Sequence, residues 1–198
     1  MPIRPMLAAT LLCVSTCFPA AVQAADYCAE AWVLRNMIFD RLGYCFGSVA
    51  GQVLFDNSDC TGKKFKPGLQ QARTVGFIRD GEAQAGCQID TTEPPSAAMR
   101  QVHAHFSRII DLPAPDHVGG YACWGYRGPA FDLHSGASTD SPVLGTALPG
   151  QSVVTTYYSL YPDWLFFDIV TGPDGETLVS GWSTGVDIGE ANCDLVAG

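Results

Sequence analysis

Cysteine content constrains this chain more than any other feature, because eight cysteines occur in 198 residues. Three of them lie in the stretch 28–60, together with aromatic residues and two turn signals. The chain has no CxxC pair, and from Cys28 onward successive cysteines are 17, 15, 27, 36 and 70 residues apart. This spacing argues against a zinc-ribbon or thioredoxin-type site and favours a framework of disulfides.

The first 24 residues predict a secretory signal peptide. Arg4 supplies the basic start, the 13 residues 6–18 form an apolar stretch, and Ala24 ends a small-residue cleavage site. A membrane-spanning helix needs about 20 apolar residues. Cys17 lacks the Leu and small-residue run of a lipobox, so cleavage after Ala24 is preferred to lipidation. We therefore expect a periplasmic or secreted chain with no transmembrane segment.

Cleavage would also remove Arg4 and two cysteines. The remaining chain would have 10 basic and 20 acidic residues, since 11 basic and 20 acidic residues are present in total. Such a chain repels nucleic-acid phosphates and anionic lipid surfaces, so no nucleic-acid partner is expected. Six cysteines would remain in an oxidising compartment, and geometry must decide how they pair.

Residues 27–42 predict one helix, with Asp26 as its N-cap and Gly43 as its C-cap. At about 100° per residue, Glu30, Asp40 and Arg41 lie away from the apolar face. The face expected to be buried comprises Cys28, Ala31, Trp32, Arg35, Ile38, Phe39 and Leu42.

Arg35 stands in the middle of that apolar face. An unpaired buried guanidinium is costly, so we expect a carboxylate or several carbonyls as its partner, with Asp56 and residues 57–59 as candidates. An anion-binding role for Arg35 would need access that a packed helix does not give, so the structural interpretation is preferred. The neighbouring Asn36 is expected to hold a loop.

Ser48 predicts the cap of a short second helix over residues 49–56, with Val49 and Val53 among its inward residues. Cys45 and Cys60 flank this helix. A disulfide between them would close a short loop and contribute about 3 kcal/mol in the chain-entropy model.

Residues 69–85 predict a third helix that ends close to Cys87. If it packs antiparallel to the first helix, its end lies beside the start of the first. This arrangement predicts a disulfide between Cys28 and Cys87, which compensates for the small core of so short a domain.

These residues resemble the YARHG domain, a small module of exported bacterial proteins, over roughly residues 26–90. Within the eponymous motif Arg41 and Gly43 are kept, but a leucine stands in place of the histidine, so no acid–base or metal role is expected from it. The resemblance implies no established activity. The sequence also resembles an uncharacterised subgroup of these proteins, in which this module precedes a second domain of unknown function. The matching residues are Trp32, Arg35, Asn36, Ile38, Phe39 and the run 41–44.

Residues 91–95 mark a boundary, and Ser96 predicts the cap of a connector helix that continues to about residue 110. His103 and His105 suggest a metal pair at first sight. On a helix, residues two apart point about 200° away from each other, whereas on a strand they would share a face. The apolar spacing favours the helix, so we expect no metal site and no cofactor.

From residue 121 the pattern changes to short β-type runs separated by turns. Residues 172–175 form a strong hairpin signal between the last two runs. We therefore expect a small all-β barrel or sandwich. The predicted strands are residues 130–133, 143–146, 153–158, 164–170 and 178–182.

The sequence of residues 133–145, 148–150 and 181–183, together with Trp164, resembles that of bacterial SH3-like domains over roughly residues 120–190. The resemblance implies a small barrel that recognises cell-wall peptide or glycan. Because such a barrel brings its ends together, it also implies a disulfide between Cys123 and Cys193. The aromatic candidates for ligand binding are Trp124, Tyr126, Tyr157, Tyr158, Tyr161 and Trp164.

The sequence thus predicts an α+β chain in four parts. These are a signal peptide (1–24), a disulfide-stapled YARHG-like helical domain (25–90), a linker with a helix (91–119) and an SH3-like β-barrel domain (120–198).

No catalytic motif has its local context, so we expect no enzyme. The acidic pairs Asp163 with Asp168 and Asp174 with Glu176 are interpreted as solvated turn residues. We expect a periplasmic binding module whose partner is peptidoglycan or an envelope protein. The alternative is an accessory or inhibitory subunit that acts through the helical domain.

Overall fold

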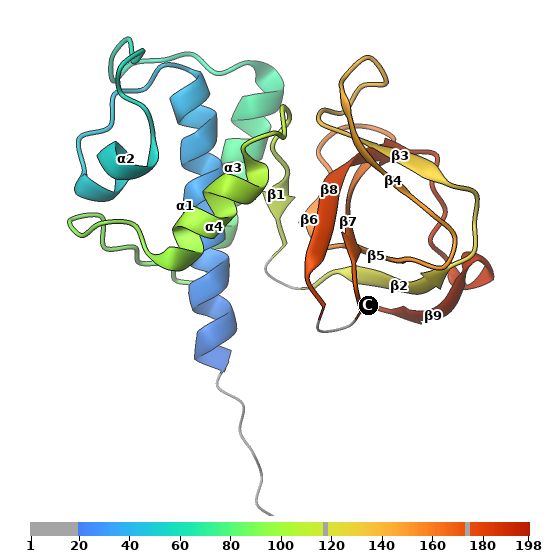
Figure 1. Cartoon of the computed structure of the whole chain (residues 1–198). Coiled ribbons are helices and arrows are strands. Elements are labelled where there is room, and N and C mark those ends of the chain that lie inside the picture. Colours follow the sequence, from blue (N-terminus) through green and yellow to red (C-terminus); the bar gives the residue numbers. More distant parts are fainter. Residues whose placement is uncertain (1–19, 117–118, 173–174) are drawn as a thin grey trace, which may run out of the picture.

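A computed structural model describes residues 20–116, 119–172 and 175–198 of the chain (Figure 1). Residues 1–19, which include most of the predicted signal peptide and Cys17, lie outside the described residues. Helices occupy the N-terminal half and strands the C-terminal half, so the α+β prediction is confirmed at this level. In the described part of the chain, no helix combines the length and the apolar character that a membrane crossing requires.

Four helices build the described part of the N-terminal half, and the longest of them, α1, packs against α3 and α4. Because α1 already begins at Ala20, the prediction that Asp26 caps it is wrong. Its end is as predicted, since Gly43 follows with a φ of +78°. The helices are α1 (Ala20–Arg41), α2 (Val49–Leu54), α3 (Leu69–Gln84) and α4 (Ala97–Phe106).

Helix α1 is buried on more than the predicted face. Val33 and Leu34, which lie outside that face, are fully buried, because neighbouring elements cover α1 on several sides. A one-face prediction assumes a helix on the surface, whereas α1 is the central helix of its half (Figure 1).

Arg35 finds its carboxylate on α3 rather than in the predicted loop. Its Nε and Nη2 donate to the two carboxylate oxygens of Glu82, each at 2.9 Å. The predicted partners Asp56 and residues 57–59 are therefore wrong, and so is the loop role of Asn36, whose amide donates to the carbonyl of Trp32 one turn earlier. The sequence could not show this pair because its members are 47 residues apart.

Substitution of one member of this ion pair should destabilise the protein. Glu82→Leu leaves the guanidinium of Arg35 without its carboxylate in a site where both side chains are at least 80% buried. We expect the free energy of unfolding to fall by about 2 kcal/mol. Urea denaturation followed by tryptophan fluorescence measures this loss.

The double variant Arg35→Met with Glu82→Leu is the matched control. It removes both charges together, so its stability should lie much closer to that of the wild type. A double variant as unstable as Glu82→Leu alone would contradict the explanation that the unpaired charge of Arg35 causes the loss of stability.

Helix α2 begins as predicted, because the Ser48 hydroxyl accepts the N–H of Gly51 at 3.2 Å. Its orientation differs from the prediction. Val49 is 43% and Val53 61% exposed, whereas Ala50 and Gly51 face inward. A Cβ on Gly51 would lie 2.9 Å from atoms of Phe46, so this close approach turns the glycine side of α2, and not the valine side, toward the core.

The three disulfides join the pairs expected from the sequence, with Cα atoms 5.0 to 5.3 Å apart. The Cys28–Cys87 bond ties α1 to the end of the antiparallel α3. The pairs are Cys28 with Cys87, Cys45 with Cys60, and Cys123 with Cys193.

The C-terminal half contains a strongly curved antiparallel sheet of seven strands in the order β4-β3-β8-β7-β5-β2-β9 (Figure 1). Among the described residues no ladder joins the edge strands β4 and β9, so the sheet is not a closed barrel. The strands are β2 (Tyr121–Tyr126), β3 (Phe131–His134), β4 (Val143–Ala147), β5 (Ser152–Thr155), β7 (Trp164–Val170), β8 (Thr177–Thr184) and β9 (Cys193–Ala197).

A separate two-stranded ladder pairs β1 (Ala114–Pro115) with β6 (Tyr157–Tyr158). The predicted strand 153–158 is therefore wrong as a single element. It divides into β5, which belongs to the large sheet, and β6, which leaves that sheet to pair with the end of the connector.

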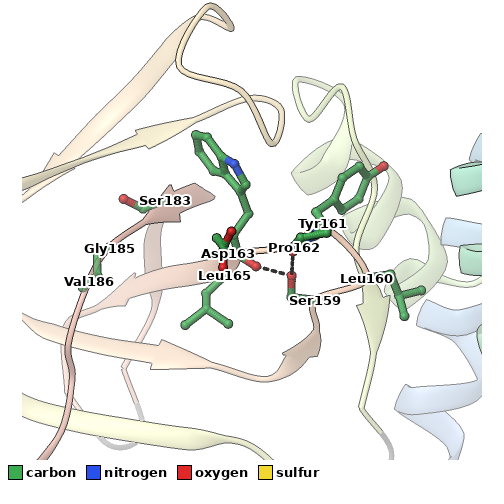
Figure 2. Close-up of a pocket in the computed structure, with 10 residues that line it drawn as sticks. Ser159, Leu160, Tyr161, Pro162, Asp163, Leu165, Ser183, Gly185 and Val186 are labelled. Atoms are coloured by element: carbon green, nitrogen blue, oxygen red, sulfur yellow. Dashed lines mark hydrogen bonds between the residues drawn. The ribbon is translucent and has the colours of Figure 1, made fainter.

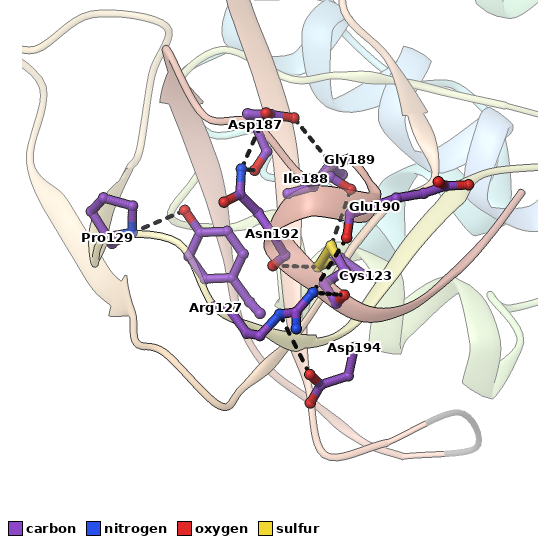
Figure 3. Close-up of a disulfide and its surroundings, with 11 residues drawn as sticks. Cys123, Arg127, Pro129, Asp187, Ile188, Gly189, Glu190, Asn192 and Asp194 are labelled. Atoms are coloured by element: carbon purple, nitrogen blue, oxygen red, sulfur yellow. Dashed lines mark hydrogen bonds and ion pairs between the residues drawn. A yellow bond between two sulfur atoms is a disulfide. The ribbon is translucent and has the colours of Figure 1, made fainter.

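The Cys123–Cys193 disulfide ties β2 to β9 beside the short 3-10 helix η1 (Glu190–Asn192) (Figure 3). The Arg127 guanidinium reinforces this corner, because its Nη2 donates to the carbonyl of Cys193 at 2.6 Å and its Nε lies 3.5 Å from the carboxylate of Asp194. Both sulfurs are buried, so the bond is a structural one.

The two halves share one hydrophobic core. A single cluster of buried residues contains Ile38 from α1, Phe106 from α4, and Phe166 and Trp182 from the outer face of the sheet. The Phe106 ring lies 5.8 Å from the Phe166 ring. A second cluster, which includes Val153, Phe167 and Ile169, fills the inside of the curved sheet.

Because of this shared core, thermal unfolding should show a single cooperative transition. Residues 25–90 alone would expose the apolar surface that α4 and the sheet cover, and should not fold stably. Calorimetry of the whole chain and near-UV circular dichroism of the fragment check this. Two separate transitions, or a natively folded fragment, would show independent domains.

Candidate functional site

The loop of residues 159–164 enters β7 through a tight turn. The N–H of Trp164 donates to the carbonyl of Tyr161 at 3.2 Å, which closes the turn over Pro162 and Asp163. Proline suits the second position of such a turn because its φ is already fixed. The Ser159 hydroxyl contacts the carbonyl oxygens of Tyr161 and Trp164 and holds the loop from inside (Figure 2).

Asp163 has a φ of +63° and is the one non-glycine residue with positive φ in the described part of the chain. Its backbone is held there by Thr184, whose hydroxyl donates to the Asp163 carbonyl at 2.5 Å. The side chain is exposed and makes no hydrogen bond or ion pair with any described residue. This conformation typically costs about 1 kcal/mol or more, and such strain is often found at functional sites.

A pocket of about 660 Å³ lies between this loop and the segment 183–186, where β7 begins and β8 ends (Figure 2). Its volume is in the range that holds a small ligand. We call it the loop pocket. Its lining consists of Ser159, Leu160, Tyr161, Pro162, Asp163, Trp164, Leu165, Ser183, Gly185 and Val186.

The loop pocket combines apolar surface with two free polar groups. Leu165 is 40% exposed, although it is a large apolar side chain on a strand. Ser183 is only 5% exposed, and its hydroxyl has no hydrogen-bond partner among the described residues. Asp163 is the one charged residue among the described residues that line the pocket.

Two of the six predicted aromatic residues, Tyr161 and Trp164, line the loop pocket. The Trp164 ring meets the ring of His134 edge to face at 5.8 Å. The Tyr161 hydroxyl donates to Asp111 at 3.2 Å, and burial with that carboxylate raises the pKa of Tyr161 well above its usual range. Tyr161 therefore also connects the pocket to the junction between the two halves.

The other four predicted aromatic residues lie elsewhere, so the six do not form one groove. Tyr126 is buried in the sheet, and its hydroxyl donates to the carbonyl of Pro129. Tyr157 packs against Phe106 at the junction, and the ring of Tyr158 lies 4.4 Å from that of Phe77. Trp124 lines a separate pocket of about 330 Å³.

Comparison with known protein families assigns the part of the chain that carries the loop pocket to one of them. Residues 86–198, more than half of the chain, match the domain of unknown function DUF4453. The chain belongs to the DUF4453 family. Residues 9–70 match the YARHG domain, which confirms that resemblance. Searches of curated proteins and of solved structures gave no match.

The DUF4453 match starts before α4, so it includes the connector helix together with the sheet. Arg41, a residue of the YARHG motif, contacts the region that matches DUF4453. The Nη1 of Arg41 donates to the carbonyl of Ile110 at 2.7 Å, and Nη2 lies 3.5 Å from the carbonyl of Phe106. In this DUF4453 protein Arg41 thus binds backbone carbonyls at and just beyond the end of α4.

A second polar cluster lies where α4 meets the DUF4453 sheet. The Ser180 hydroxyl donates to the Asp168 carboxylate, and His105 Nε2 lies 2.9 Å from the same hydroxyl oxygen. Burial raises the pKa of Asp168 to about 6, although the hydrogen bond from Ser180 opposes this, and burial lowers the pKa of His105. The prediction that Asp168 is a solvated turn residue is therefore wrong, because it lies inside β7.

This cluster does not have the geometry of a serine nucleophile. In a catalytic triad the serine donates to histidine and the carboxylate orients the histidine, whereas here Ser180 donates directly to Asp168. His103 makes a different contact, because its ring lies 5.5 Å from the ring of Phe55. Among the described residues, no group of three His, Cys, Asp or Glu side chains could hold a metal ion.

Asp168→Asn should stabilise the protein at neutral pH. The folded pKa of about 6 lies above that of an unfolded aspartate, so the wild type loses stability as the pH rises through this range. The variant avoids the buried charge and can still accept the Ser180 hydrogen bond. We expect a gain of about 2 kcal/mol near pH 7.5 that largely disappears near pH 4.

Urea denaturation of both proteins at the two pH values measures this effect. Ser180→Ala is the control, because loss of the hydrogen bond to the carboxylate should steepen the dependence of stability on pH. An Asp168→Asn variant that is less stable than the wild type near pH 7.5 would show that the carboxylate stabilises the fold.

Proposed function

We propose that the chain is an exported, non-enzymatic binding module that holds a short segment of peptidoglycan in the loop pocket. The observation that carries this proposal is the pocket itself, whose lining combines exposed apolar surface with the Ser183 hydroxyl and the Asp163 carboxylate, neither of which has a partner among the described residues. Such a mixture of apolar walls and a few polar groups is typical of ligand sites.

Two further observations support this function. The match to the YARHG domain and the three disulfides are consistent with an extracellular location. The resemblance of residues 120–190 to SH3-like domains, although the sheet is open, favours recognition of cell-wall polymers. Within the described part of the chain, no second carboxylate lines the pocket beside Asp163, which favours binding over general acid–base hydrolysis.

The mature protein should be retained on purified peptidoglycan sacculi, and Trp164→Ala should weaken that retention by about tenfold, as expected for an aromatic contact in a binding site. A co-sedimentation assay with quantified bound and free protein measures this. Trp124→Ala is the matched control, because it removes the same side chain from the other pocket.

Thermal unfolding of both variants must first show that each still folds. Equal retention of Trp164→Ala and the wild type would exclude the loop pocket as the binding site. Absence of retention of the folded wild type would refute peptidoglycan as the ligand.

A further inference from the structure

The charge of the loop pocket limits the chemistry of its ligand. Among the described residues, its lining carries one formal charge, the carboxylate of Asp163, within a protein whose formal net charge is -9. An anionic group would be repelled by both, whereas a cationic group is attracted over a distance and finds in the pocket a carboxylate that no described residue pairs with.

The backbone at Asp163 gives a second, independent indication. At a φ of +63° a glycine would be free of strain, yet an aspartate occupies the position. No described residue pairs with its carboxylate, so this group does not stabilise the fold through a hydrogen bond or ion pair with them. Residues with positive φ often lie at ligand sites, and the carboxylate of Asp163 is available to a ligand at this pocket.

The hydroxyl of Ser183 is the third element. Ser183 lines the same pocket, and its hydroxyl lacks a partner among the described residues. Among the described residues, Ser135 Oγ is the one buried side-chain polar atom without a partner, so the Ser183 hydroxyl is accessible from the pocket and can accept a hydrogen bond from a ligand.

These observations point to an ammonium group. We propose that the loop pocket binds a primary ammonium group of the ligand, with the Asp163 carboxylate as its counter-ion and the Ser183 hydroxyl as a further acceptor. An ammonium ion has three donors and needs few partners, whereas Ca²⁺ takes six or more oxygen ligands, of which this lining supplies too few. The proposal rests on the proposed function and specifies which part of peptidoglycan is recognised.

Chemical acetylation of sacculi tests the proposal because it converts free amines to neutral amides. Retention of the wild type should fall by at least about tenfold on acetylated sacculi, as expected for the loss of a charge-assisted hydrogen bond. Undiminished retention would overturn the ammonium proposal and leave the binding of peptidoglycan intact.

Two variants at Asp163 separate charge from backbone strain. Asp163→Asn keeps a residue that tolerates positive φ but removes the charge, so its retention should fall by about tenfold and become insensitive to acetylation. Asp163→Gly frees the backbone, so its melting temperature should not be lower than that of the wild type although binding is lost. Full retention of either folded variant would overturn the proposal.

A soluble amine gives a readout that does not depend on peptidoglycan. In an NMR titration cadaverine should shift the amide signals of Asp163 and Ser183, whereas its diacetylated form should not. Shifts without retention on sacculi would support the ammonium site and refute the proposed function. Absence of shifts together with retention insensitive to acetylation would refute the ammonium site alone.

The ammonium group has two sources in peptidoglycan, the stem peptide and a deacetylated amino sugar. Sacculi stripped of stem peptides by an amidase distinguish them. Loss of retention identifies the peptide amine, and persistent retention that acetylation still abolishes identifies the sugar amine. Retention on stripped sacculi that acetylation does not change would overturn the proposal.

Discussion

The packing of α4 between α1 and the outer face of β7 and β8 is the contact on which the rest of the structure depends. Phe106 at the end of α4 lies against Phe166, and Phe166 lies against Trp182, so helices and sheet bury one continuous apolar surface. A helical unit of this size could hardly supply a sufficient core alone. The disulfides therefore reinforce a unit that also depends on the sheet.

The same junction positions the loop pocket. The Trp182 Nε1 donates to the carbonyl of Asp111 at 2.6 Å, while the carboxylate of Asp111 accepts from the Tyr161 hydroxyl and from the N–H of Ala137. Tyr161 begins the turn that carries Asp163. The connector thus holds the pocket loop through side-chain contacts at sites far apart in sequence, and pre-organisation of this kind lowers the entropic cost of binding.

Prediction from sequence succeeded where the signal was local. The cap at Ser48, the end of α1 at Gly43 and the strand that begins at Trp164 follow from residues that are neighbours in the chain. It failed for Arg35, whose partner lies on another helix, and for Val49, whose exposure depends on how α2 packs. Asp163 was interpreted as a solvated turn residue, and the proline before it was the local signal of a turn that allows positive φ.

The sequence by itself determined the α+β division and most element positions, because periodicity, caps and turn residues act over a few residues. It also predicted the cysteine pairs, although the pair Cys123 with Cys193 was inferred through the resemblance to a barrel. Only the tertiary structure decided that the sheet stays open, that the halves share a core, and that two of six aromatic candidates meet at one pocket with Asp163 and Ser183. Those outcomes depend on contacts between distant residues, whose register and orientation no local pattern encodes.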